Sequence, residues 1–234
     1  MELHADFDRR AVQHGAELAW VPSPMPGVER RMLERIGTEV ARATTIVRYA
    51  PGSAFSPHVH GGGEEFLVLE GVFSDEHGDF PAGSYVRNPP TSKHTPGSAP
   101  GCTILVKLWQ FNLADREGVR LRPGEPPYAE TPEAGVAARA LHHDARETVR
   151  CERWAAGTRI DRTPAGGLEL FVVKGAFRGA GGESFAPWSW LRLPPGEPLR
   201  ATAGTEGTEV WLKEGHVAAA AARFAEAFAA TSPG

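Results

Sequence analysis

The apolar residues of the chain fall into short runs separated by glycine and proline, a pattern typical of short β-strands. In the first half of the chain the clearest runs are 44–49, 65–69, 85–87 and 103–109. In the second half they are 151–154, 169–173, 190–193 and 209–213. Short strands at this spacing predict an all-β fold of the sandwich or barrel type.

This pattern occurs twice along the chain. The segments VRYAPGSA, EEFLVLEGVF, SYVRNPP and GCTILVK begin at residues 47, 64, 84 and 101. Their counterparts ERWAAGTR, LELFVVKGAF, SWLRLPP and GTEVWLK begin at residues 152, 168, 189 and 207. The offset stays between 104 and 106 residues through all four pairs. An offset this constant predicts a duplicated domain.

The repeat divides the chain into four expected parts. Residues 1–111 are expected to form the first domain with an N-terminal arm, and residues 135–216 the second. The segment 112–134 is polar, rich in proline and without periodicity, which indicates a linker. The alanine-rich end, 217–234, predicts a short helix that packs through Phe224 and Phe228 at i, i+4 spacing.

Composition narrows the classes of function. The 234 residues carry a net charge of −4 with a pI of about 6.1, so a nucleic-acid partner is not expected. The two cysteines, Cys102 and Cys151, are too few for a disulfide framework and are expected to be reduced and buried. No apolar segment resembles a signal peptide or is long enough to span a bilayer. We therefore expect a cytoplasmic protein without a membrane partner.

Four residues of the first half suggest a metal site. His58 and His60 are two apart and point to the same side of a strand, and Glu64 and His94 follow them. Three imidazoles and one carboxylate suit Zn, Fe(II), Mn, Ni or Co. Glu64 shares a strand face with apolar side chains, where a carboxylate needs a partner charge. Its neighbour Glu65 is the alternative ligand.

These residues match the first motif of the cupin family, G-x5-H-x-H-x3-E-x6-G, through Gly52, His58, His60, Glu64 and Gly71. A common form of the second cupin motif is matched by Pro81, Gly83 and His94, without the asparagine that often follows the histidine. More narrowly, residues 44–110 resemble the cupin-like domain of the anti-sigma factor ChrR. The resemblance implies a bicupin, two fused jelly-roll (double-stranded β-helix) barrels. It also implies one divalent metal, with Zn or Fe favoured, inside the first barrel.

Two departures from these families limit what the resemblance implies. ChrR holds its sigma factor with an N-terminal zinc domain, whereas residues 1–40 here contain no cysteine, so a sigma-factor partner is not expected. The second copy has also lost the ligands. His58 aligns with Thr163 or, with the gap moved, Arg162; His60 with Ala165 or Pro164; Glu64 with Leu168; and His94 with Leu199. The second copy is then a structural or dimerising half, or a pocket lined by Trp188, Trp190 and Trp211.

Three functions fit the first site. We favour a ChrR-like metal-binding cupin that senses or processes a small oxidised molecule. A metal-dependent dioxygenase acting on a diketone or enediol is the alternative, with Glu64 as candidate base. The second alternative is a metal that only stabilises the barrel. Arg87 is read as a surface residue or as a contact for an anionic ligand. Homodimerisation through sheet edges is a further expectation.

Overall fold

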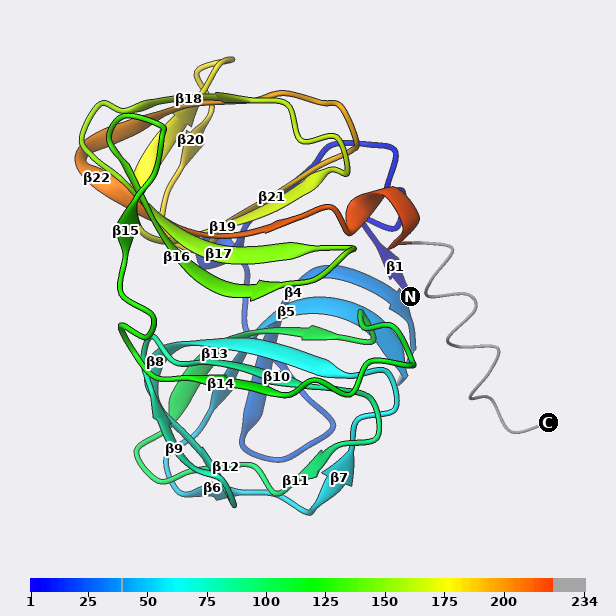
Figure 1. Cartoon of the computed structure of the whole chain (residues 1–234). Coiled ribbons are helices and arrows are strands. Elements are labelled where there is room, and N and C mark those ends of the chain that lie inside the picture. Colours follow the sequence, from blue (N-terminus) through cyan, green and yellow to red (C-terminus); the bar gives the residue numbers. More distant parts are fainter. Residues whose placement is uncertain (39, 221–234) are drawn as a thin grey trace. The chain divides into compact units, whose positions relative to one another are not determined.

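The computed structural model describes residues 1–38 and 40–220, which form two compact units of antiparallel strands (Figure 1). The first unit comprises Met1–Ala5 and Ala19–Pro123, and the second comprises Asp6–Leu18 and Gly124–Ala220. Among these residues, no helix combines the length and the apolar character that crossing a membrane requires.

The first unit is built around one large sheet. Its strands, in spatial order, are β1 (Glu2–Leu3), β4 (Val28–Gly37), β5 (Ala41–Tyr49), β13 (Cys102–Leu108), β8 (Glu64–Asp75), β10 (Tyr85–Asn88) and β14 (Val119–Leu121). Short strands extend it, namely β3 (Val21–Pro22), β6 (Ser53–Ala54), β9 (Gly78–Pro81) and β12 (Gly97–Ser98). A separate two-stranded sheet pairs β7 (His58–Val59) with β11 (Lys93–His94).

The second unit repeats this order. Its sheet runs β15 (Ala129–Glu130), β16 (Val136–His143), β17 (Thr148–Trp154), β22 (Leu199–Glu214), β19 (Leu168–Gly179), β21 (Ser189–Leu193) and β2 (Ala11–His14). Strands β18 (Arg159–Arg162) and β20 (Ser184–Phe185) pair with β22 and β19. The order β16-β17-β22-β19-β21 mirrors β4-β5-β13-β8-β10. Each unit has the antiparallel strand order of a jelly roll, so the predicted all-β fold of two jelly-roll units is confirmed.

Each unit encloses its own apolar core, because alternate residues of the long strands point inward. In the first unit Phe66 and Val68 of β8 lie in the core, on the face that also carries Glu64. In the second unit the core contains Leu168, Leu170 and Val172 of β19 at matching positions. Cys102 and Cys151 are free and buried, as expected. Burial raises their thiol pKa values to about 11 and about 12.

Gly71 and Gly175 show how closely the duplication is preserved. Both have positive φ, 70° and 72°, which a glycine adopts at no steric cost. A Cβ at Gly71 would lie 2.0 Å from the carbonyl oxygen of Gly101, and one at Gly175 would lie 2.2 Å from that of Gly207. The last glycine of the cupin motif is therefore required by the close approach of two backbones.

The compact units differ from the expected domain boundaries in two ways. Residues 6–18 belong to the second unit, where β2 covers the open edge of β21 by backbone pairing. The expected linker contributes β14 to the first sheet and β15 to the second. Only the start of the expected C-terminal helix lies within the described residues, and it forms a 3₁₀ turn, η2 (Val217–Ala219). A second 3₁₀ turn, η1 (Gly15–Glu17), lies near the start of the chain. Phe224 and Phe228 lie outside the described residues.

Candidate metal centre

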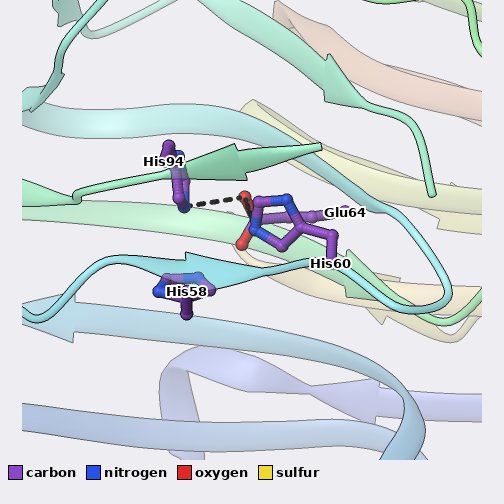
Figure 2. Close-up of side chains that lie close together, drawn as sticks. All are labelled: His58, His60, Glu64 and His94. Atoms are coloured by element: carbon purple, nitrogen blue, oxygen red, sulfur yellow. Dashed lines mark ion pairs between the residues drawn. The ribbon is translucent and has the colours of Figure 1, made fainter. Parts of the chain in front are cut away.

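The structure brings His58, His60, Glu64 and His94 together in the first unit (Figure 2). His58 on β7 and His94 on β11 are direct cross-strand partners. His60 follows β7 by one residue, and Glu64 begins β8. One ligand atom from each side chain can be chosen so that all four lie within 4.8 Å of one another. His58 is the least buried of the four.

The spacing of these atoms suits a first-row transition metal. The His60 Nε2 and His94 Nε2 atoms lie 3.3 Å and 3.6 Å from Glu64 Oε2. An ion bound at about 2.1 Å separates neighbouring ligand atoms by roughly 3 to 3.5 Å. His60 Nε2 is also buried and has no hydrogen-bond partner. A buried imidazole nitrogen without a partner is costly in an apolar setting, and a metal ion would satisfy it.

The Nδ1 atoms of the three histidines each face a protein oxygen. His94 Nδ1 lies 3.3 Å from Asp75 Oδ2, and His58 Nδ1 lies 3.4 Å from the Ser56 carbonyl. His60 Nδ1 lies 3.1 Å from Ser92 Oγ, whose own proton is donated to the Pro89 carbonyl at 2.6 Å. Because each of these oxygens accepts, Nδ1 carries the proton in each ring. The lone pair is left on Nε2, the arrangement typical of metal-binding histidines.

The pKa values of His60 and His94 are shifted in opposite directions. Burial lowers the pKa of His60, which keeps the ring neutral and able to bind a metal. Burial also opposes protonation of His94, but the hydrogen bond to Asp75 and the charge of Glu64 outweigh it and raise the pKa. Despite its own burial, Asp75 has a lowered pKa because His94 and the His77 backbone donate hydrogen bonds to it.

Glu64 and Glu65 point to opposite faces of β8. Glu64 faces the histidines, whereas Glu65 Oε2 accepts a hydrogen bond of 2.7 Å from Arg87 Nη1. Arg87 also stacks on the Phe111 ring at 4.2 Å, and its side chain is fully buried. Arg87 is therefore neither a surface residue nor a contact in the candidate site. Its burial could not be predicted because Asp115 and Phe111, which cover it, come from the segment after β13.

Three residues beside the ligands were missed by sequence reasoning. Asn88 donates a hydrogen bond of 3.1 Å to Glu64 Oε2, and Asp75 and Ser92 face two of the imidazoles. Asn88 ends β10 directly opposite Glu64. The cross-strand register of β8 and β10 would have indicated that Asn88 lies beside Glu64. Asp75 is the last residue of β8, before a polar turn, and carries no sequence signal for this role.

The glycine run between the ligands is shaped by aromatic packing. A Cβ on Gly62 would lie 2.3 Å from Cδ2 of the Trp109 ring, too close for any side chain. Trp109 follows β13, and its backbone N–H donates to the Gly63 carbonyl at 3.1 Å. The indole thus fixes the path of the chain from His60 to Glu64, which explains why the sequence requires glycine there.

The second unit has leucines where the first has Glu64 and His94. Arg162 pairs with Leu199 in the register in which His58 pairs with His94, so Arg162 rather than Thr163 is the counterpart of His58. Leu168 and Leu199 belong to the apolar core, together with Leu193 at the position of Asn88. Trp190 and Trp211 are fully buried and lie on the opposite face of the sheet from this core.

Charged residues of the second interior pair with one another. Glu152 is buried and accepts hydrogen bonds from Arg150, Trp154 and Arg162. Among the residues that the structure describes, the histidine and carboxylate group of the first unit has no equivalent here.

Comparisons with known proteins agree with this picture. The model of the ChrR cupin-like domain family matches residues 8–112. No match was found among the curated proteins.

Solved structures share the fold over most of the chain. A candidate dioxygenase of Nostoc punctiforme is 11% identical with a TM-score of 0.66, covering 93% of this chain and 83% of its own. A bacterial pirin of Escherichia coli in complex with nickel(II) is 14% identical with a TM-score of 0.64, covering 88% and 98%. A variant of oxalate decarboxylase from Bacillus subtilis is 12% identical with a TM-score of 0.61, covering 88% and 77%. Residues 8–112 thus match the family model of the ChrR cupin-like domain, and the chain has the bicupin fold.

Proposed function

We propose that the first unit binds one divalent transition metal through His58, His60, Glu64 and His94, and that the ion holds a small oxidised molecule for sensing or processing. Zn and Fe(II) are the favoured ions, and Mn, Ni and Co also suit this ligand set. The observation that carries the proposal is the convergence of three imidazoles whose Nδ1 atoms all face protein oxygens. A metal held there would supply Lewis-acid or redox chemistry.

The residues around the ligands suit a small-molecule site. Phe73 packs 5.7 Å from the His94 ring and, with Phe66, provides apolar walls that exclude water. His58 is the least buried ligand, so the approach to an ion is expected from its side. Tyr49 packs against Phe55 at 5.2 Å. Burial and the charge of Glu64 raise the pKa of Tyr49, so its hydroxyl stays protonated as a hydrogen-bond donor.

Metal content is the direct test of this proposal. Protein purified without added metal is expected to contain one ion per chain by mass spectrometry. His60→Ala and Glu64→Ala are expected to lose it. His77→Ala removes an exposed histidine from the neighbouring turn and should keep it. Wild-type metal content in both ligand variants would contradict the proposal.

A dioxygenase is the second candidate, and the fold shared with a candidate dioxygenase of Nostoc punctiforme is the observation that favours it. Glu64 would act as the base, and Tyr49 would donate a hydrogen bond to the substrate oxygen. The test is oxygen consumption by Fe(II)-loaded protein with acetylacetone as the diketone. Turnover that falls at least tenfold in Tyr49→Phe supports the dioxygenase, and no oxygen uptake by the wild type rejects it for diketones.

A further inference from the structure

A large cavity lies in the first unit beside the candidate metal centre. It has a volume of about 1030 Å³, enough for a small organic molecule. One wall is formed by residues 54–56, which lead directly into β7. The carbonyl of Ser56 in this wall accepts the Nδ1 proton of His58. Ser56 therefore connects the cavity to His58, although none of the four candidate ligands lines the cavity itself.

Strand β4 supplies two arginines to this cavity. Val28, Arg30 and Met32 alternate along β4 on the face that packs into the core, as the core position of Val28 shows. A register shift between Met32 and Glu34 then brings Arg35 to the same side. Arg31, between them, points to the opposite face and stacks on Trp20 at 4.3 Å. The alternation of the strand thus directs Arg30 and Arg35, but not Arg31, into the cavity.

The positive charge of the cavity is not neutralised by the residues that line it. No aspartate or glutamate occurs among them. Arg35 donates a hydrogen bond to the Thr38 carbonyl, and Arg30 Nε is buried without a hydrogen-bond partner. Burial and the charge of Arg30 lower the pKa of Arg35, as expected for two cations facing one space. Among the described residues, which do not include Glu39, neither Arg30 nor Arg35 forms an ion pair.

The rest of the lining is apolar and adaptable. Met25, Met32 and Phe55 contribute to it, and methionine side chains adjust to ligands of different shape. Guanidinium groups bind carboxylates through paired hydrogen bonds, and more strongly where water is excluded. A cavity with two arginines and apolar walls selects a molecule with an anionic end and an apolar body.

We propose that this cavity binds an organic carboxylate, with its carboxylate on Arg30 and Arg35 and its apolar body against Met25, Met32 and Phe55. The inference rests on the proposed function in one respect, since the remaining end of the ligand is directed toward the ion at His58. It assigns the ligand class of the centre as carboxylic acids rather than neutral diketones.

The test is calorimetric titration of the full chain with phenylacetate and octanoate and with the neutral amides of both. At least one carboxylate is expected to bind ten or more times tighter than its amide. Arg30→Gln and Arg35→Gln should each reduce carboxylate affinity at least tenfold without changing metal content. Arg31→Gln, the neighbour on the opposite face of β4, should bind like the wild type. Titrations of chelator-treated protein report the contribution of the arginines without the ion.

Three results would overturn the inference. They are no binding of either carboxylate, equal affinity for acid and amide, and equal losses in Arg31→Gln and Arg30→Gln. If Arg35→Gln does not fold, Arg35→Lys keeps the charge but not the planar fork, and a selective loss of carboxylate affinity is expected. Failure of the proposed function is recognised separately, because the wild-type protein would then contain no metal at His58 and its neighbours.

Discussion

At the scale of single residues, the candidate centre depends on groups that orient the ligands as much as on the ligands themselves. Asp75 is the clearest case, because its carboxylate accepts the Nδ1 proton of His94 and leaves Nε2 free. Such partners fix the tautomer and the orientation of the ring and increase its basicity. Ser92 does the same for His60 through a neutral hydroxyl.

Asp75→Asn should therefore weaken metal binding without unfolding the protein. Partners of metal-bound histidines typically account for about 10- to 100-fold in affinity, so a loss in this range is expected. The measurement is competition with a chromophoric chelator of known affinity. Asp79→Asn, which changes an exposed carboxylate on β9 that bonds Ser74, is the matched control. Equal affinities of the two variants would show that Asp75 does not position His94.

At the scale of elements, the sequence predicted the parity of the ligands but not the contacts that hold them. Strand alternation placed Glu64 on the core side, where the structure has it, whereas Glu65 lies on the opposite face and is buried against Arg87. The contacts of Trp109 with the glycine run depend on how two distant segments approach each other, which local pattern does not encode. The pairing of β2 with β21 is another such case, because the four residues of β2 are too few to show a periodicity from which a partner strand could be predicted.

Gly62→Ala tests the element that joins His60 to Glu64. The added methyl group would collide with the Trp109 ring, so the loop must shift and metal affinity should fall at least tenfold. In the background of Trp109→Ala the same change should cost much less, since the colliding ring is gone. Gly181→Ala, which meets nothing within 4 Å, is the control. The measurement is again chelator competition, and equal losses in both backgrounds would contradict the packing argument.

The buried network of β17 and β18 predicts a pH dependence of stability in the second unit. Despite burial, hydrogen bonds and charges from Arg162 and Arg150 lower the pKa of Glu152. The folded pKa lies below the unfolded one, so the stabilisation is present above about pH 4.5 and is lost as the pH falls through the folded pKa. Glu152→Gln should cost about 2 kcal/mol at pH 7, because it weakens the charged hydrogen bonds from Arg150 and Arg162, which keep Glu214 and Glu133 as partners.

The measurement for Glu152 is denaturant unfolding of the wild type and the variant between pH 7 and pH 3. The difference in free energy of unfolding should shrink steadily below pH 4.5. A difference that stays constant over this range would show that the ionised carboxylate does not stabilise the fold.

At the scale of the whole molecule, the duplication separates fold from chemistry. The two units share strand order, glycine positions and core pattern, yet the second has leucines at the positions of Glu64 and His94. A jelly roll of this sequence type therefore forms without metal ligands. The repeat made this asymmetry visible in the sequence, whereas exact unit boundaries depended on pairing at sheet edges. Arg35 could not be assigned to the cavity from the sequence because a register shift within β4 sets its direction.

Removal of metal should accordingly leave the protein folded. Chelator treatment is expected to preserve the far-ultraviolet circular dichroism spectrum while lowering the thermal stability of the metal-bearing unit, since binding to the folded state stabilises it. The unfolding temperature of the second unit, with Glu152 unchanged, should be the same before and after chelator treatment. Complete unfolding on chelation would instead favour a metal that only stabilises the barrel.

Anomalous diffraction from crystals of the metal-loaded protein is the decisive test of the four-ligand metal centre. We expect one anomalous peak per chain, about 2.0 to 2.2 Å from Nε2 of His58, His60 and His94 and from a carboxylate oxygen of Glu64. No peak is expected in the second unit. A metal bound elsewhere, with these four side chains uncoordinated, would show that they do not form the metal centre.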